Sequence, residues 1–520
     1  MHFGDSSASP RLVWRVLGFT FFQAGLSTGL TLVLGLPAAY LFARYAFRGK
    51  VFLRAITAIP FMLPTVVVAA GFNALLGGRG WMNILLMDTF HLVQDPIPFL
   101  GTLAAILAAH VFYNTTILIR LVGTALERVD PHLEQAARSL GARPLHVLRD
   151  VVFPALRPAL LSATLLVFLF DFTSFGVVLL MGAGRFATLE VEIYRQALQF
   201  SDLPLAALLS FIQLACTLAF SVIYSRLISG PAAAAATRSS SRPAQPARSL
   251  GQKCFQTGMI LLLGTFFLLP LLSLPLRSFT RLEADRGERG GVQYGLTADY
   301  YTGLFVNQRA SVFYVPPVQA LGNSLAYAAA TVILSLALGF PAAAALARPG
   351  PLERALDPFL MLPLGASAVT LGLGFIVSFG RWMVSPFFVP IAHTLIALPF
   401  VIRTLQPALA AIPRRLREAG ATLGASPRQV WWTVDWPVVS RATLAAGVFA
   451  FTVSLGEFGA TSLVVRPEYP TLPVAIARFL DLPGGMNYGQ AMAMATLLML
   501  VCGTGILLLE KLRLPGTGEF

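Results

Sequence analysis

Long apolar stretches are the feature of this sequence that most limits how it can fold. A helix needs about 20 apolar residues to cross the hydrocarbon core of a bilayer, and in lipid its backbone polar groups must be satisfied internally. Eleven stretches reach this length, so we predict an all-α polytopic membrane protein with about eleven transmembrane helices. The predicted spans are 17–42, 55–76, 100–122, 159–181, 205–228, 255–276, 320–346, 355–379, 388–409, 442–465 and 491–509.

The composition agrees with a membrane protein and excludes several other classes. Hydrophobic residues make up 56% of the chain and charged residues 12%, about half the charged share of a soluble protein. The net charge of +14 does not indicate nucleic-acid binding, because the cations stand singly and form no basic block with interleaved aromatic residues. Cys216, Cys254 and Cys502 have no paired spacing, so neither disulfides nor a metal site are expected. The first residues lack the regions of a removable signal peptide, so none is expected.

The distribution of lysine and arginine predicts the orientation of the chain. Cytoplasmic loops carry an excess of these residues, and the loops on one side of the predicted spans hold 25 of the 38 cations. We therefore expect a cytoplasmic C-terminus and, with eleven spans, an external N-terminus.

The two halves of the sequence repeat each other. Sliding the sequence by 283 residues places 109–195 on 392–478 without a gap, and about 27 of these 87 positions are identical. Nearer the start of each half, LGLPAAYLFAR (34–44) is similar to LGFPAAAALAR (338–348). We expect a first repeat at 1–229, a flexible cytoplasmic linker at 230–252 and a second repeat at 253–520. Parallel repeats of this kind are typical of transporters.

A cytoplasmic loop inside each repeat carries the strongest motif. The loop at 124–155 contains LEQAARSLGARPLHVLRDVVFP, and the loop at 411–437 contains LREAGATLGASPRQVWWTVDWP. Each predicts a short helix with small residues on one face, a glycine turn, a second short helix and a proline that opens the next span. The small side chains would let another protein approach the backbone closely.

These loops resemble the cytoplasmic EAA loop of type I ABC-importer permeases, the binding-protein-dependent transport inner-membrane components. The pattern E-A-A, three residues, G, nine residues, I-x-L-P is matched twice, with departures at Gln135 and Gly420, so one docking contact is expected to be weaker or differently made. In that family the loop docks in a groove of the ATPase subunit. The resemblance implies ATPase coupling through Glu134, Gln135, Ala136, Ala137, Gly141, Glu418, Ala419, Gly420 and Gly424.

The resemblance covers nearly the whole chain and implies the partners. These are an ATP-binding cassette ATPase dimer, an extracytoplasmic solute-binding protein and the lipid of a bacterial inner membrane, with no nucleic acid. The sequence contains no G-x-x-x-x-G-K-[ST] motif for cradling nucleotide phosphates. We therefore expect a translocation subunit and not an enzyme, with no cofactor bound by this chain and with ATP and Mg²⁺ bound by the partner ATPase.

Asp171 and Glu457 are acidic residues in the interior of predicted spans. Asp171 corresponds to Ser454 in the 283-residue register, and Ser174 corresponds to Glu457, so each half is expected to place one carboxylate on its equivalent helix. A charged group inside a membrane is costly and indicates a function by default. We interpret these four residues as candidates for the translocation pathway; the alternative is a carboxylate that bonds a neighbouring helix for structural reasons.

Two further pairs of polar residues recur in the same register. His110 and His393 match, and we interpret them as hydrogen-bonded core residues and not as ligands. Arg120 and Arg403 match near the inner ends of their spans, where long cationic side chains reach the interface.

The solute is the least determined property. The segments at 172–198 and 471–480 look more like thiamine permeases than ferric-iron permeases, so thiamine or its phosphates is preferred and ferric iron stays open. An ion-coupled secondary transporter, with Asp171 and Glu457 as ion sites, would leave the paired loops unexplained. A membrane-embedded enzyme would need a cluster of catalytic groups, and the sequence has neither H-E-x-x-H nor G-x-S-x-G.

Overall fold

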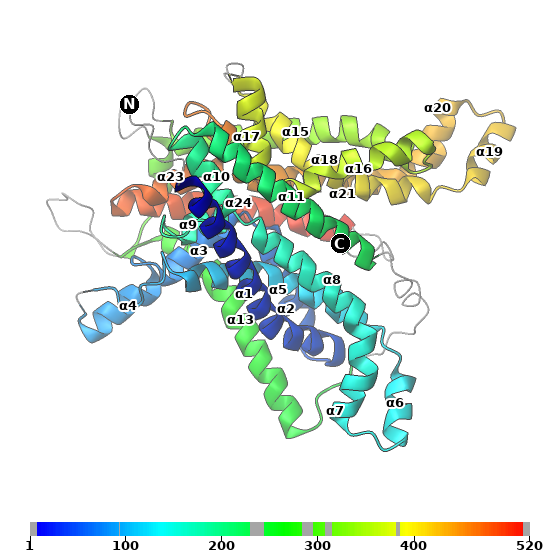
Figure 1. The fold of residues 1–520 in the computed structure, drawn as a ribbon, viewed down its shortest axis with the longest axis horizontal. Helices are drawn as coiled ribbons and strands as arrows, with labels where there is room; N and C mark the ends of the chain where they lie inside the picture. The colour runs from blue at the N-terminus through cyan, green and yellow to red at the C-terminus, as the bar shows by residue number, and fades with distance from the viewer. Residues whose placement is uncertain are drawn as a thin grey trace. The chain divides into compact units, whose positions relative to one another are not determined.

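The computed structural model describes residues 8–92, 94–228, 244–282, 295–306, 315–380 and 385–512. Most of these residues are helical (Figure 1). Among them the strands are β1 (Thr280–Arg281) and β2 (Gly295–Leu296), which pair antiparallel. The predicted all-α class is confirmed. Most of the predicted linker, at 229–243, lies outside the described residues.

Both halves build the same series of helices. The first series is α1 (Ala8–Arg44), α2 (Lys50–Met62), α3 (Thr65–Leu76), α5 (Leu103–Glu127), α6 (Pro131–Ser139), α7 (Pro144–Val147), η1 (Leu148–Val152), α8 (Phe153–Phe172), α9 (Gly176–Met181), α10 (Leu189–Leu198) and α11 (Leu203–Ile228). The second is α15 (Pro317–Leu346), α16 (Pro351–Gly365), α17 (Ala368–Phe379), α18 (Phe388–Ala410), α19 (Arg414–Thr422), α20 (Pro427–Val430), η5 (Trp431–Asp435), α21 (Trp436–Gly456), α22 (Gly459–Val464), α23 (Leu472–Asp481) and α24 (Gly485–Leu512).

A few elements have no counterpart in the other half of the described chain. Helix α4 (Trp81–Phe90) follows α3 in the first half. Helix α13 (Leu250–Ser278) precedes the second series. Helix α14 (Asp299–Thr302) and the 3₁₀ turn η3 (Gly303–Phe305) lie between α13 and α15. The repeat is therefore preserved in its helices and altered by what is inserted between or before them.

The number of membrane-spanning helices is slightly lower than the eleven spans predicted. Nine helices in the described residues are long and apolar enough to cross a membrane, or ten when the pair α2 and α3–α4, bent by 114°, counts as one. The predicted span 355–379 is broken into α16 and α17, because Ser367 leaves the helix and its hydroxyl accepts a hydrogen bond from the N–H of Thr370. The predicted spans 159–181 and 442–465 are also wrong at their ends, since α8 stops at Phe172 and α21 at Gly456.

The chain folds into two compact units, which are described separately. The first contains 1–61, 71–195 and 204–273, and the second contains 62–70, 196–203 and 274–520. Each unit therefore takes a short piece from the other half of the sequence.

In the first unit, α1, α5 and α8 pack together around a small apolar core. Most of α13 belongs to this unit. Its Phe267 ring stacks on Phe112 of α5 at 5.0 Å, and its Ser273 hydroxyl donates to the carbonyl of Gly71 at 3.0 Å. The core residues of the three-helix contact are Ala39, Ile117, Leu118, Val122, Ala163 and Val167.

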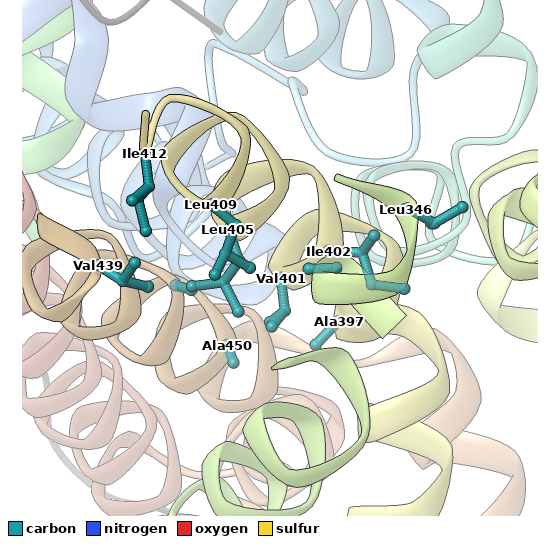
Figure 2. Packing of buried hydrophobic residues seen from close by; sticks show 11 residues of the cluster. Leu346, Ala397, Val401, Ile402, Leu405, Leu409, Ile412, Val439 and Ala450 are labelled. Atoms are coloured by element: carbon teal, nitrogen blue, oxygen red, sulfur yellow. The ribbon is translucent and has the colours of Figure 1, made fainter. Parts of the chain in front are cut away.

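In the second unit, the equivalent helices α15, α18 and α21 enclose the core shown in Figure 2. Leu405 and Val401 of α18 point into it, together with Val439 and Ala450 of α21. The same helix crossing occurs in both units at a glycine of the repeated LGxP motif. A Cβ atom on Gly339 would come within 2.7 Å of Val401, and one on Gly35 would collide with Leu118. These glycines let the two helices approach closely.

Candidate functional site

The two cytoplasmic loops have the same local structure. Helices α6 and α19 each end at a glycine in the left-handed conformation, Gly141 (φ 86°) and Gly424 (φ 80°). The N–H of the following residue then returns to the helix, from Ala142 to the carbonyl of Ala137 at 3.0 Å and from Ala425 to that of Gly420 at 3.0 Å. This is the ordinary way in which a glycine ends a helix, and the sequence predicted the turn.

The surface of the loops is partly apolar. Leu140 and the equivalent Leu423 directly follow α6 and α19, and they are 89% and 87% exposed. Most of the predicted coupling residues lie on the same surface: Gln135, Ala136, Gly141, Glu418, Ala419 and Gly424 are exposed, and Ala137 and Gly420 are half-buried. Exposed apolar patches of this kind mark sites of protein–protein contact. Figure 1 shows α6 and α7 beyond the end of α8, and α19 and α20 beyond the end of α21.

Glu134 differs from the other predicted coupling residues. Its side chain is buried and forms an ion pair with Arg44, the last residue of α1. The equivalent position in the second loop carries the opposite charge: Arg417 donates through Nε to Oδ1 of Asp435 at 2.7 Å. Both residues therefore face the body of their own unit, and not the exposed surface of the loop.

Each loop is connected to the next long helix by one turn of π-helix. The turns η1 and η5 occupy equivalent positions and lead directly into α8 and α21. A π-turn inside a longer helix is uncommon and often occurs at functional positions. At the far end of α8 lies Asp171, and directly after the far end of α21 follows Glu457.

In the first unit, Asp171 lies in a buried cluster around His110. Asp171 is fully buried on α8, and its Oδ1 atom accepts a hydrogen bond from Asn114 at 2.7 Å and lies 3.5 Å from Nδ1 of His110. The imidazole also contacts two hydroxyl groups, Ser27 through Nδ1 at 2.9 Å and Ser174 through Nε2 at 2.8 Å. The structure thus brings Asp171 and Ser174 to opposite sides of one histidine.

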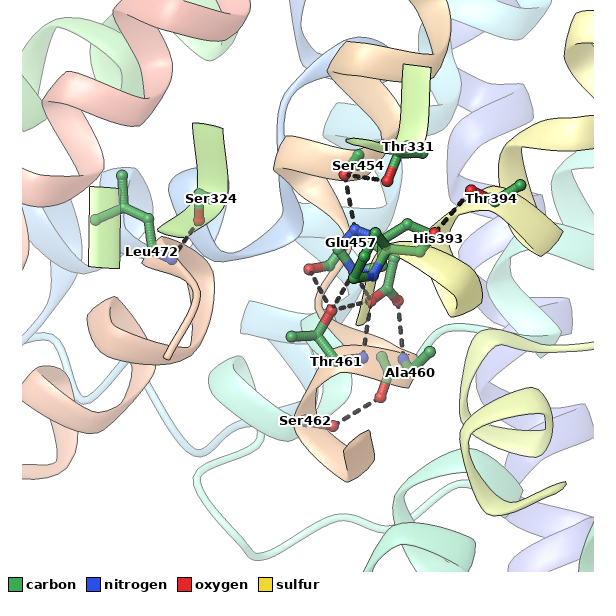
Figure 3. Close-up of polar contacts among 12 residues, drawn as sticks. Ser324, Thr331, His393, Thr394, Ser454, Glu457, Ala460, Thr461, Ser462 and Leu472 are labelled. Carbon is green, nitrogen blue, oxygen red and sulfur yellow. Dashed lines mark hydrogen bonds and ion pairs between the residues drawn. The ribbon is translucent and has the colours of Figure 1, made fainter. Parts of the chain in front are cut away.

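The second unit has an equivalent cluster around His393 (Figure 3). Its Nδ1 atom contacts the Ser454 hydroxyl at 2.7 Å, and its Nε2 atom contacts the Thr461 hydroxyl at 2.7 Å. The sequence predicted that Glu457 lies on a helix. In the structure it lies in the break between α21 and α22. Its two oxygens accept hydrogen bonds from the N–H groups of Ala460 and Thr461, both at 2.8 Å.

The carboxylate lies on a different side of the histidine in each cluster. In the first it approaches Nδ1, and in the second Glu457 lies 3.4 Å from Nε2. In each cluster the ring nitrogen nearest the carboxylate also contacts a hydroxyl group, that of Ser27 in the first and that of Thr461 in the second. The interpretation of both histidines as hydrogen-bonded core residues agrees with these contacts. The described residues contain no group of three or more His, Cys, Asp or Glu that could hold a metal ion.

Comparison with known proteins supplies the family. The model for the binding-protein-dependent transport system inner membrane component matches twice, at residues 32–229 and 335–513. The chain belongs to this family. Each matched range contains one of the cytoplasmic loops and the histidine and carboxylate of one cluster, whereas Ser27 lies ahead of the first range.

The permease is also similar to characterised relatives over most of its length. It is 30% identical to the thiamine transport system permease protein of Brucella abortus (strain 2308) over 498 residues, which are 94% of this chain and 86% of that protein. It is 28% identical to the thiamine transport system permease protein of Escherichia coli K12 over 517 residues, 97% of this chain and 89% of that protein. A putative 2-aminoethylphosphonate transport system permease protein of Salmonella choleraesuis is 29% identical over 223 residues, 43% of this chain and 77% of that protein.

Several residues of the permease's clusters were not identified from the sequence. Ser27 and Thr331, which contacts Ser454 at 3.2 Å, are equivalent positions on α1 and α15. The sequence comparison did not pair them, because the first helices of the two repeats align at a shift of 304 residues, as the two LGxP motifs show, and not at the shift of 283 residues used for the rest.

Arg403, near the inner end of its predicted span, pairs with Asp357 at 3.2 Å. Its position near the interface did not indicate this partner.

Proposed function

We propose that the permease is the membrane-spanning subunit of an ATP-driven importer of thiamine or its phosphates. A separate ATPase dimer would bind the two cytoplasmic loops, and an extracytoplasmic binding protein would deliver the solute. The relatives that match over most of the chain are thiamine transport system permease proteins, and this supports the solute. The family description, which names binding-protein-dependent transport, supports the binding protein.

The observation that carries the proposal is the paired exposure of Leu140 and Leu423. The two leucines are 89% and 87% exposed at equivalent positions of the two loops, and a partner that covers them would remove their apolar surface from water. The same arrangement occurs in both loops, so the partner must offer two similar grooves, which a dimer provides. The sequence has no P-loop of its own, and nucleotide binding is therefore assigned to that partner.

The connection of the loops to the membrane helices supports alternating access. A movement of either loop would pass through its π-turn into α8 or α21, and along that helix to the break where the histidine cluster lies. The cytoplasmic side would then be the side of the loops, and the C-terminus would lie in the cytoplasm, as the distribution of lysine and arginine predicts. Asp171 and Glu457 are enclosed in the clusters, so contact with solute would require the clusters to open.

Purification followed by reconstitution tests the proposal. We expect a P-loop ATPase to co-purify with the tagged permease from its native membrane, and vesicles that hold both to take up thiamine only with ATP and the binding protein. Leu140→Asp with Leu423→Asp should remove the ATPase, whereas Leu250→Asp, at a leucine 78% exposed outside both loops, should not. Uptake of ferric iron in place of thiamine would change the solute. Uptake by the permease alone, driven by a proton or sodium gradient, would establish the ion-coupled alternative.

A further inference from the structure

We propose that two ion pairs, Arg44–Glu134 and Arg417–Asp435, position the coupling loops and attach them to different helices. The first loop would be attached to α1, and the second to the start of α21. The proposal rests on the proposed function, because it concerns how movement of an ATPase reaches the membrane helices. It makes the two loops mechanically unequal although their folds are the same.

The first contact joins three segments that are distant in the sequence. Arg44 is the last residue of α1, and its guanidinium binds Glu134 of α6, with both side chains about nine-tenths buried. The main chain at the end of α1 also binds the last part of the predicted linker. The Gln245 N–H donates to the Arg44 carbonyl at 3.1 Å, and the Ala46 N–H donates to the Gln245 carbonyl at 3.0 Å. A displacement of α6 would therefore act directly on the end of α1.

The second loop lacks this contact and has another in its place. Arg417 replaces the acid, and it binds Asp435 at the last position of η5, immediately before α21. Arg348, the equivalent of Arg44, donates to the carbonyl of Ile412 at 3.2 Å, which lies ahead of α19. The position equivalent to Asp435 in the first half is Val152, a member of an apolar core with Ala43 and Leu126.

The two loops therefore differ both in the charge of the loop residue, Glu134 or Arg417, and in the residue that this charge binds, Arg44 or Asp435. Glu134 and Asp435 are buried and the side chain of Arg44 is 11% exposed, whereas that of Arg417 is 34% exposed. A buried charge is strongly unfavourable without its counter-ion, so Glu134 depends on Arg44 and Asp435 depends on Arg417. The first loop would move α1, which packs on α5 and α8. The second loop would move α21, whose far end carries Ser454 of the His393 cluster.

Charge reversal in the complete transporter tests the proposal. The variants are Glu134→Arg, Arg44→Glu and their combination, and Arg417→Asp, Asp435→Arg and their combination, each assembled with the ATPase and the binding protein. For each single variant we expect thiamine uptake to fall by about tenfold or more while the ATPase stays bound, because its exposed surface on the loop is intact. Each combination should restore uptake to within about threefold of the unmodified protein, because the pair is re-formed with its charges exchanged.

The control and the further measurement separate positioning from docking and folding. Arg54 forms a half-exposed pair with Glu127 at 3.3 Å, and Arg54→Gln should leave uptake unchanged because such pairs contribute little. ATP turnover should continue in the single variants without matching uptake, which loss of structure alone would not produce.

The failures are distinguishable. Unaltered uptake in the single variants, loss of the bound ATPase, or failure of a variant to accumulate in the membrane would each overturn the positioning role. A lack of ATP-dependent uptake by the unmodified protein would instead overturn the proposed function.

Discussion

The Nε2 atom of His393 lies 3.4 Å from an oxygen of Glu457. That oxygen also accepts hydrogen bonds from the N–H and the hydroxyl of Thr461, and the other oxygen accepts from the N–H of Ala460. The carboxylate therefore joins α18 to the start of α22 at the point where the chain leaves α21. In the first half the carboxylate belongs to Asp171 and reaches the other nitrogen of His110. The two halves hold the same break with a carboxylate placed on opposite sides of the imidazole.

Glu457→Gln should abolish thiamine uptake and leave assembly intact. The amide keeps the size of the side chain, but it offers one oxygen to two N–H groups that now bind two oxygens, and its NH₂ group would face donors. We expect a loss of about tenfold or more in uptake by reconstituted vesicles, since a buried donor left unsatisfied costs about 1–3 kcal/mol. Glu468→Gln, at an exposed residue of the same half, is the control. Unchanged uptake would remove Glu457 from the transport mechanism.

Moving the carboxylate should restore part of what its removal loses. Glu457→Ser reproduces Ser174, and adding Ser454→Asp reproduces Asp171, so the double variant gives the second cluster the side chains found at these positions in the first. We expect the double variant to transport faster than Glu457→Ser alone, by about threefold or more, because His393 regains a carboxylate. The measurement is the rate of thiamine uptake by the unmodified protein, the single variant and the double variant in vesicles of the same composition. Equal rates in the double and single variants would show that the side of the histidine matters.

Replacing Gly141 and Gly424 together by valine should release the ATPase. Both residues have positive φ, where a β-branched side chain is strained by about 1–2 kcal/mol or more at each position. No atom lies within 4 Å of the Cβ atom that either residue would gain, so the effect would come from the backbone and not from a collision. Retention of the ATPase during purification is the measurement. Gly258→Val, at a helical glycine with equally open surroundings, should retain it.

Gly339→Ala should lower the stability of the second unit. Its new Cβ atom would lie 2.7 Å from Val401, within the core of Figure 2, and overpacking of this kind costs about 1–3 kcal/mol. Thermal unfolding of the purified permease should show a lower midpoint than that of Gly29→Ala, whose Cβ atom meets nothing within 4 Å. An unchanged midpoint would mean that α15 and α18 separate at little cost.

The repeat made much of the candidate site predictable, but it did not predict contacts in which the two halves differ. The fixed register predicted that Gly141 and Gly424, and His110 and His393, would have equivalent places, and each pair does. The acidic residues Asp171 and Glu457 stand three positions apart in that register and approach different nitrogens of the histidine. The register did not predict that Glu134 is buried against Arg44, 90 residues away in the sequence. The motif placed Glu134 among the docking residues because it stands beside Gln135, and sequence neighbours on a helix point in different directions.

The sequence by itself determined the all-helical class, the two repeats and the cytoplasmic loops, because these depend on local properties: the length of apolar stretches, the periodic recurrence of polar residues, and glycine at a turn. Only the tertiary structure decided where the helices break, which half of the sequence α13 packs against, and which partner each buried charge has. Those features depend on contacts between segments far apart in the chain, whose formation is favoured by the packing and hydrogen bonding of the whole unit and not by any one segment.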